Sequence, residues 1–221
     1  TRYSSVTGVQ TCALPIYRGK VLTAEELDAG REFARYKDLD GDGIPYRTWP
    51  GTHPDKGAYF TRGTSRNPQA QYSERGPDYV YNMERLLRKW DTAKSLVPQP
   101  VVAQSDIPAK HGAIYFGSTS PAMAEAVVAL REDGIALDTL RLRAFPFPES
   151  VREFIDAHET VFVVEQNRDG QMRSLLVNEF GIDPARLVAV LHYDGTPITA
   201  RFIAGAIASS VRPQAQKEKV A

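Results

Sequence analysis

The sequence contains a single cysteine, Cys12, among its 221 residues. One thiol excludes an intrachain disulfide, a cysteine-ligated zinc site and a cysteine-bound iron–sulfur cluster within this chain. No apolar run approaches the roughly 18 residues that a membrane-spanning helix needs. Basic and acidic side chains both number 27, so no excess charge predicts a nucleic-acid or membrane partner. These absences leave a globular protein of one or two domains.

The glycine fingerprints of phosphate-binding loops are also missing. Neither G-x-G-x-x-G nor G-x-x-x-x-G-K-[ST] follows the first predicted strand of the second half, where Gly117-Ser-Thr-Ser-Pro121 stands instead. Two interpretations remain for this segment. In the first, backbone amides at the start of the following helix bind an anion. In the second, which we favour, the side chain of Ser118 or Thr119 caps that helix.

What the chain does have is a long irregular segment from Gly41 to Arg66, rich in glycine, proline and threonine. Compact domains rarely keep so long a segment unless it binds or covers something. Its basic residues outnumber its acidic ones: Arg47, His53, Lys56, Arg62 and Arg66 stand against Asp42 and Asp55. Because guanidinium groups pair well with carboxylate and phosphate oxygens, the segment predicts binding of a small anion.

The run Asp38-Leu-Asp-Gly-Asp-Gly43 matches the first half of a calcium loop. The twelfth position of such a loop needs a bidentate glutamate, and here it is Trp49. We therefore expect a turn in which aspartate side chains accept hydrogen bonds from backbone amides, and we assign no metal ligand.

Two helices flank the long segment. Thr23 followed by Glu26 forms a capping box, which predicts a helix to about Tyr36. A second helix is predicted over about 76–93, with an apolar stripe that we interpret as core packing and with basic residues facing outward. The stripe is Tyr79, Met83, Leu86, Leu87 and Trp90, and the basic residues are Arg85, Arg88 and Lys89.

From about residue 112 strands and helices alternate. Near-continuously apolar strands joined by helices predict an α/β fold with a mostly parallel sheet covered on both faces. Thr196 is expected to open the last helix. Strands are predicted over 113–116, 137–144, 160–165 and 187–191, and helices follow them to about 132, over 148–157, over 170–179 and over 197–208.

Three segments are expected to lie outside the domains. Residues 1–16 look foreign, because the run VTGVQTCALPI resembles the translation of a sequencing adapter, although an ordinary N-terminal strand is the alternative. Residues 97–111 contain three prolines and predict an extended linker. Residues 209–221 are polar and predict a loose tail.

Glu165-Gln-Asn-Arg168 follows a buried strand, at the edge where open α/β sheets place ligands. We interpret Glu165, Asn167 and Arg168 as residues of a subunit interface or of a pocket edge. An ordinary exposed loop is the alternative.

Several long runs of this sequence resemble the α subunit of 2-oxoacid:ferredoxin oxidoreductases, nearest to the 2-oxoglutarate type (2-oxoglutarate synthase). They lie in the order of that family and span most of Gly19 to Ile207. The runs are DLDGDGIPYRTWPGTHPDKGAYFTRGTSR, NMERLLRKWDTAK, RLRAFPFP, VFVVEQNRDGQMRSLL and LHYDGTPITARFIAGAI.

The resemblance implies a cytoplasmic, thiamine-diphosphate-dependent enzyme that decarboxylates a 2-oxoacid, reduces ferredoxin through an iron–sulfur cluster and releases an acyl-CoA. Residues 17–96 then form the end of a pyrimidine-type domain with the substrate loop, and residues 112–208 resemble the C-terminal domain of transketolase. Thiamine diphosphate, magnesium and the cluster are expected mainly outside this chain, with a β subunit as partner. The family's cofactor-activating glutamate has no counterpart here, so no catalytic residue is assigned and the fragment alone is expected to be inactive.

In the family, the arginine of a segment R-[ST]-x-P-G grips the substrate carboxylate, and Arg47 matches it. Thr52, His53 and Lys56 follow closely and are expected to reach the distal carboxylate of 2-oxoglutarate. One alternative is a non-catalytic module of the same complex that docks the partner subunit. Another is an independent nucleotide- or phosphate-binding protein, which the missing glycine fingerprint opposes.

Overall fold

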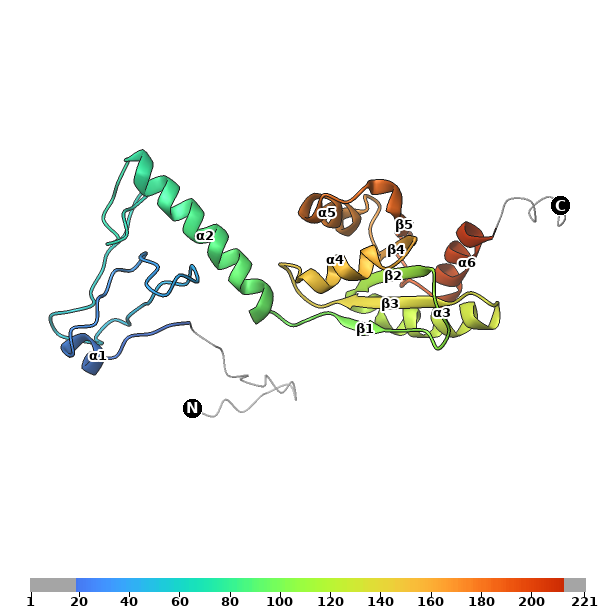
Figure 1. The fold of residues 1–221 in the computed structure, drawn as a ribbon, viewed down its shortest axis with the longest axis horizontal. Coiled ribbons are helices and arrows are strands. Elements are labelled where there is room, and N and C mark those ends of the chain that lie inside the picture. Colours follow the sequence, from blue (N-terminus) through green and yellow to red (C-terminus); the bar gives the residue numbers. More distant parts are fainter. Residues whose placement is uncertain (1–18, 213–221) are drawn as a thin grey trace. The chain divides into compact units, whose positions relative to one another are not determined.

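The computed structural model describes residues 19–212. It divides into two compact units, residues 1–93 and residues 94–221, and each is described by itself (Figure 1). The adapter-like segment 1–16 and residues 213–221 of the expected tail lie outside the described residues. Within residues 19–212, no helix combines the length and the apolar character that crossing a membrane requires.

The first unit begins with helix α1, which is shorter than the sequence predicts. Its capping box is present, since Thr23 and Glu26 each accept a hydrogen bond from the other's backbone N–H. The helix nevertheless covers only Ala24–Asp28, because Gly30 adopts a φ of 83°. This left-handed conformation ends helices, so the predicted extension to Tyr36 is wrong.

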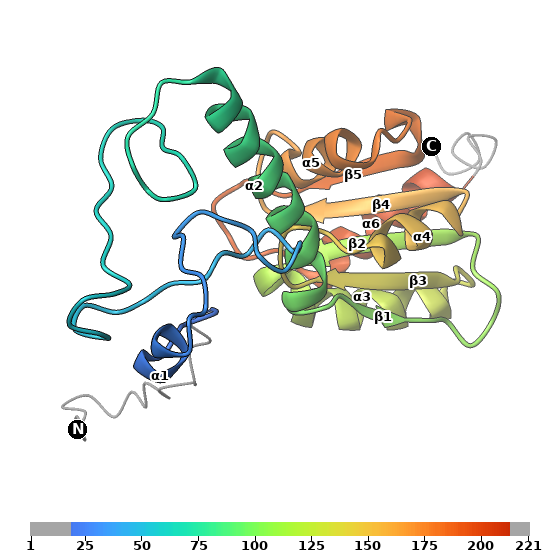
Figure 2. The same cartoon turned by 60° about the vertical axis from the view of Figure 1, so that its left-hand side comes forward.

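Between α1 and helix α2, which covers Gly76–Leu96, the chain forms no helix or strand among the described residues. Isolated bridges join Val21 to Arg47 and Arg66 to Tyr72. Figures 1 and 2 show this part of the chain as a series of irregular loops. The long irregular segment that the sequence predicts is therefore confirmed.

The aspartate-rich turn lies against α2. The Asp38 carboxylate accepts hydrogen bonds from the amides of Gly41 and Gly43, each at 3.0 Å, and from the Arg88 guanidinium at 3.1 Å. Gly43 approaches the helix so closely that an added Cβ would lie 2.2 Å from the backbone nitrogen of Lys89. The prediction of a turn held by aspartate side chains is confirmed.

Helix α2 buries a different face from the one that the sequence predicts. Its buried residues are Asn82 and Arg85, and Arg85 donates a 3.1 Å hydrogen bond to the carbonyl of Gly43. The irregular segment packed here offers backbone carbonyls rather than apolar side chains, so polar residues of the helix face it. The predicted core stripe is exposed instead: 53% for Tyr79, 40% for Met83, 43% for Leu86, 69% for Leu87 and 44% for Trp90. Both predictions, core packing of the stripe and an outward Arg85, are wrong.

The second unit is a five-stranded sheet between two layers of helices (Figures 1 and 2). The strand order is β1-β3-β2-β4-β5, with β1 antiparallel to β3 and all other pairs parallel. The predicted α/β fold with a mostly parallel sheet is confirmed. The strands are β1 Val101–Ala103, β2 His111–Phe116, β3 Leu137–Leu142, β4 Thr160–Glu165 and β5 Leu187–Leu191. The helices are α3 Ser120–Glu132, α4 Glu149–Asp156, α5 Gln171–Phe180 and α6 Ala200–Val211, with 3-10 turns η1 Gly117–Thr119 and η2 Pro184–Arg186.

Each face of the sheet has its own apolar core. Ala113 and Phe162 pack with α3 and α6 on one face, whereas Ile114 and Val163 pack with α4 and α5 on the other. Successive side chains of a strand point to opposite faces, so uninterrupted apolar strands fill both cores. The described part of the second unit therefore contains a core on either side of its sheet.

Three predictions at the margins of this unit are wrong. Val101–Ala103, within the expected linker, is an edge strand paired with β3, a position that tolerates the preceding Pro100. The hydroxyl that caps α6 belongs to Thr199, not to Thr196. Helix α6 also continues through residues 209–211, where the tail was expected to begin. The domain boundaries themselves stay predictions.

Candidate functional site

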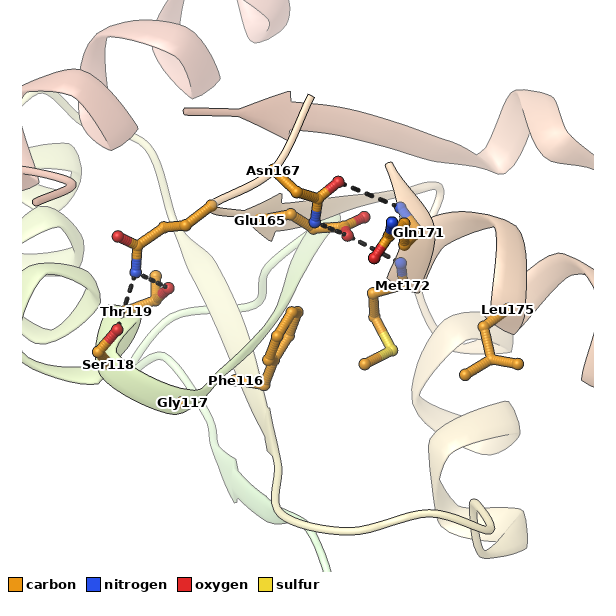
Figure 3. A pocket seen from close by; sticks show the side chains of 10 residues that line it. Phe116, Gly117, Ser118, Thr119, Glu165, Asn167, Gln171, Met172 and Leu175 are labelled. Carbon is orange, nitrogen blue, oxygen red and sulfur yellow. Dashed lines mark hydrogen bonds between the residues drawn. The ribbon is translucent and has the colours of Figure 1, made fainter. Parts of the chain in front are cut away.

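The direction of winding of the parallel sheet changes between β2 and β4. The chain passes from β2 through α3 to β3 on one side, and β4 lies on the other side of β2. Open α/β sheets place ligands at this point, outside the carboxyl ends of the strands. A cleft of about 480 Å³ lies there (Figure 3). It is lined by Phe116, Gly117, Ser118, Thr119, Glu165, Gln166, Asn167, Gln171, Met172 and Leu175.

Glu165, in the wall of this cleft, is fully buried. Its carboxylate accepts hydrogen bonds from the amides of Met172 at 2.8 Å and Arg173 at 2.9 Å, in the first turn of α5. The side-chain amide of Asn167 adds a third bond at 2.8 Å (Figure 3). Since a helix N-terminus attracts negative charge, the chain's own carboxylate occupies the anion position of α5.

Gln166 joins the two loops beside the cleft. Its Nε2 donates to the hydroxyl oxygens of Ser118 at 3.0 Å and Thr119 at 3.2 Å, and its Oε1 accepts from the amide of Ile198 at 3.4 Å. Thr119, at the cap position of α3, makes no side-chain cap bond. The predicted cap is therefore wrong, because these hydroxyls hold Gln166. Sequence reasoning missed this bridge, because Ser118 and Thr119 lie 48 and 47 residues before Gln166 in the chain.

Two of the three residues expected at this edge line the cleft, Glu165 and Asn167, and Arg168 does not. The Arg168 side chain is 75% exposed and its Nε lies 2.7 Å from the Asp169 carboxylate. The cleft wall thus consists of amides, hydroxyls, apolar groups and one hydrogen-bonded carboxylate, with no cationic side chain.

A second pocket, of about 470 Å³, lies within the irregular segment of the first unit. Its wall includes the exposed aromatic side chains of Trp49, Tyr59 and Phe60. The lining residues are Thr48, Trp49, Pro50, Gly51, His53, Lys56, Gly57, Ala58, Tyr59, Phe60 and Thr61.

His53 and Lys56 line this pocket, and both bind Asp28 at the end of α1. The Nδ1 of His53 accepts hydrogen bonds from the amides of Asp55 at 3.0 Å and Lys56 at 2.9 Å. The proton of the ring is therefore on Nε2, which donates to the Asp28 carboxylate at 2.9 Å. The Lys56 ammonium lies 2.9 Å from the same oxygen and also donates to the Leu27 carbonyl at 3.2 Å. Lys56 first, and His53 next, hold the pKa of Asp28 below its usual 3.8. These two side chains fasten the segment to α1.

Arg47 lies beside the same pocket, and Thr52 forms a turn. The Arg47 guanidinium carbon is 5.7 Å from the ring centroid of Trp49. Among the described residues Arg47 has no ion-pair partner, and its Nε is buried without a hydrogen bond. The Thr52 hydroxyl accepts a hydrogen bond from the Trp49 amide at 2.9 Å. Trp49 thus contacts two of the four predicted substrate-binding residues. Within residues 19–212, His53 and Lys56 of this set contact the Asp28 carboxylate, and Arg47 contacts none.

Three arginines around Tyr36 form a feature that the sequence analysis did not anticipate. The guanidinium carbons of Arg35, Arg66 and Arg85 lie 5.3, 5.2 and 5.9 Å from the tyrosine ring centroid. Each Nε is buried without a hydrogen bond among the described residues. Burial alone raises the pKa of Tyr36, but the Thr61 hydroxyl, the Arg66 guanidinium and the charge of Arg35 outweigh it and leave that pKa below its usual 10.0.

The described residues do not fit the magnesium ion or the iron–sulfur cluster that the resemblance implies. Across residues 19–212, no three His, Cys, Asp or Glu side chains lie close enough together to hold a metal ion. We therefore assign no ligand and no reaction step to these groups in this chain.

Residues 109–196 match the family model of pyruvate:ferredoxin oxidoreductase core domain II. The chain is 28% identical over 198 residues to 2-oxoacid:ferredoxin oxidoreductase 2, subunit alpha, of Aeropyrum pernix, covering 88% of this chain and 29% of the relative. It is 29% identical over 119 residues to the 2-oxoacid:ferredoxin oxidoreductase subunit alpha of Saccharolobus solfataricus, covering 52% of this chain and 18% of the relative. The chain spans less than a third of the length of these relatives.

Among solved structures, the chain is similar to the 2-oxoglutarate:ferredoxin oxidoreductase of Magnetococcus marinus, determined with 2-oxoglutarate, coenzyme A and succinyl-CoA bound. The TM-score is 0.73 at 20% identity, covering 84% of this chain and 32% of that one. At this identity the likeness shows a shared fold. Sequence and fold together therefore identify a chain similar to 2-oxoacid:ferredoxin oxidoreductase α subunits, in which residues 109–196 match core domain II of the pyruvate:ferredoxin oxidoreductase family.

Proposed function

We propose that this chain is part of the α subunit of a thiamine-diphosphate-dependent 2-oxoacid:ferredoxin oxidoreductase, and that its substrate is 2-oxoglutarate. The similarity to two α subunits supports the enzyme class, and the fold shared with an enzyme solved with 2-oxoglutarate supports the substrate. In this proposal the complex forms an acyl-CoA and reduces ferredoxin. A β subunit is the partner, the cofactors are held mainly outside this chain, and the complex is cytoplasmic.

The state of Arg47 is the observation that carries the proposal. Guanidinium groups pair well with carboxylates, yet the half-buried Arg47 has no such partner among the described residues, and its buried Nε makes no hydrogen bond. Two parallel N–H bonds from a guanidinium fix both the position and the orientation of a carboxylate. We therefore assign Arg47 to the carboxylate of the 2-oxoacid, with Trp49 as the wall on which its guanidinium rests.

His53, Lys56 and Thr52 complete the proposed substrate site. An ammonium group has three donors, and the hydrogen bonds of Lys56 to Leu27 and Asp28 leave a third donor for the distal carboxylate of 2-oxoglutarate. His53 and Thr52 hold the turns that carry these groups. Thiamine diphosphate, when bound, supplies the electron sink for decarboxylation, and the residues of this chain bind and orient the 2-oxoacid.

Replacing Arg47 by lysine in the assembled enzyme tests this assignment. Arg47→Lys keeps the charge and removes the two-pronged bond, whose loss costs about 1.5–3 kcal/mol. We expect the KM for 2-oxoglutarate to rise by roughly ten- to a hundred-fold, with unchanged thiamine diphosphate content. Arg62→Lys, at an exposed arginine of the same segment, is the matched control. An unchanged KM in Arg47→Lys removes Arg47 from the site.

The exposed apolar stripe of α2 favours a second candidate function, that of a subunit-assembly module. Contiguous exposed apolar side chains mark interaction surfaces, and those of Tyr79, Met83 and Leu87 are 53%, 40% and 69% exposed. The relatives are also much longer than the region matched here. We propose that another polypeptide segment of the assembled oxidoreductase covers this stripe.

A charge placed on the stripe distinguishes assembly from catalysis. Leu87→Glu should change the unfolding free energy of the isolated chain by no more than about 0.5 kcal/mol, as surface substitutions do, but weaken co-purification with the β subunit. Val128→Glu, at a 58% exposed position of α3, is the control. Normal recovery of the complex with Leu87→Glu would exclude the stripe as a subunit contact.

Arg168→Glu tests the sheet edge in the same assay, and weaker co-purification would support a docking role for this edge. Lost turnover in an intact complex would indicate a chemical role there.

A further inference from the structure

The arginines around Tyr36 adjoin a small pocket in the first unit. Its volume is about 170 Å³, and since one water molecule occupies about 30 Å³, it has room for an ion with four oxygens. The lining residues are Tyr36, Thr64, Ser65, Arg66, Tyr79, Asn82, Met83, Arg85 and Leu86.

The pocket gathers positive charge, and no carboxylate is among its lining residues. Arg85 is only 5% exposed, and burial lowers the pKa of its guanidinium. Arg66 donates to the Tyr36 hydroxyl at 3.4 Å and to the Gly63 carbonyl at 3.0 Å. Neither arginine pairs with a carboxylate in the described part of the chain, although the charge of Asp38 acts on Arg85 from beyond the lining. Removing one partner from a buried ion pair is strongly destabilising, so an anion in this pocket would supply what the arginines lack.

The pocket also holds one hydrogen-bond acceptor without a donor. The Nδ2 of Asn82 donates to the carbonyls of Arg66 at 2.6 Å and Asp78 at 3.1 Å, and these two bonds fix which end of the amide is oxygen. Its Oδ1 is then buried without a partner, in a side chain that is 8% exposed. An unbonded acceptor among cations fits an anion that still carries a proton.

We propose that this pocket binds inorganic phosphate in its monohydrogen form. The guanidinium groups of Arg66 and Arg85 hold the unprotonated oxygens, with the neighbouring hydroxyls as further donors, and the P–OH donates to the Oδ1 of Asn82. Arg35 adds positive charge from beyond the lining. Sulfate and carboxylates lack that proton at neutral pH, so the pocket discriminates against them. The site is independent of the substrate role proposed for Arg47.

Titration of the full 221-residue chain tests the site without any enzyme assay. Calorimetric titrations at pH 7.5 and constant ionic strength use potassium phosphate, potassium sulfate and potassium chloride. We expect one phosphate per chain, sulfate at least ten-fold weaker, and no chloride binding. Trp49 and Trp90 both lie in the first unit, so phosphate should also raise the unfolding temperature seen by tryptophan fluorescence. No phosphate binding, or sulfate binding as tightly, would overturn the proposal.

Variants then locate the bound ion. Arg66→Gln is expected to weaken phosphate binding at least ten-fold, and Arg85→Met, which leaves an apolar side chain in the buried position, should do the same. Arg35→Gln removes charge outside the lining and should weaken binding only several-fold, whereas Arg62→Gln, in the exposed part of the same segment, should bind as the unmodified chain does. Unchanged affinity in folded Arg66→Gln or Arg35→Gln protein, judged by circular dichroism, shows that phosphate binds elsewhere.

Discussion

Glu165 illustrates how a charged residue at the ligand edge of a sheet is taken up by the fold itself. Its position after a buried apolar strand predicts a pocket-edge role, and it does line the cleft. The carboxylate is nevertheless fully buried and bonded to two amides of α5 and to Asn167. A helix start that already holds a carboxylate is unavailable to an external phosphate.

Replacing this carboxylate by an amide should destabilise the second unit. Glu165→Gln retains one acceptor oxygen and turns an NH₂ group toward backbone N–H donors, so we expect a loss of about 1.5–3 kcal/mol in unfolding free energy. Urea unfolding followed by far-ultraviolet circular dichroism measures this change. Asp169→Asn, at an exposed carboxylate of the same loop, is the control and should differ little. Equal stability of Glu165→Gln would show that the buried charge contributes nothing.

At the scale of elements, α2 shows that helical periodicity predicts an apolar face but not what covers it. The helix buries Asn82 and Arg85 because the neighbouring loop offers backbone oxygens, such as the Gly43 carbonyl that Arg85 binds. The Thr92 hydroxyl likewise donates to the Asp42 carbonyl at 2.7 Å. Polar contacts therefore attach the loop to the helix within the first unit, and the apolar side chains of the α2 stripe stay exposed.

Two glycines of the aspartate-rich turn provide a matched test of this attachment. Gly41 and Gly43 have positive φ values of 80° and 75°, but a Cβ at Gly41 meets nothing within 4 Å, whereas one at Gly43 meets Lys89 at 2.2 Å. Gly41→Ala should therefore cost only backbone strain, about 1–2 kcal/mol. Gly43→Ala adds a collision and should cost about 3 kcal/mol or more. Tryptophan-detected urea unfolding compares them, and equal losses would mean that the turn does not depend on contact with α2.

At the scale of the whole molecule, the apolar core is distributed unevenly. The buried apolar residues of the first unit within the described range are Leu22, Leu27, Ala34 and Ala70. The second unit has an apolar cluster on each face of its sheet. Buried apolar area is the main favourable contribution to folding, so the two units should differ in stability.

Unfolding of the full chain should therefore occur in two steps. Both tryptophans, Trp49 and Trp90, belong to the first unit, so their fluorescence should change at a lower urea concentration than the circular dichroism of the sheet-containing unit. Phosphate-free buffer avoids stabilising the first unit through the proposed anion site. A single urea midpoint seen by both methods would contradict independent unfolding of the two units.

Sequence reasoning succeeded where a structure is stabilised by interactions that the local sequence pattern specifies. Unbroken apolar strands must be buried on both faces, and the ranges 160–165 and 187–191 were predicted to the residue. The capping box and the aspartate turn were also predicted, because their partners lie within a few residues. Arg47, Thr52, His53 and Lys56 were named from a resemblance, and their roles stay predictions.

The amino-acid sequence by itself determined the α/β class, the extent of β4 and β5 and the position of the irregular segment, because these depend on periodicity and on neighbours along the chain. Only the tertiary structure decided that the Glu165 carboxylate accepts hydrogen bonds from the first turn of α5, and that His53 and Lys56 both bind Asp28. It also decided that Arg35, Arg66 and Arg85 lie around Tyr36. The physical reason is that charge and hydrogen-bonding groups act over a few ångströms in space. Which of them meet depends on how segments far apart in the chain are brought together.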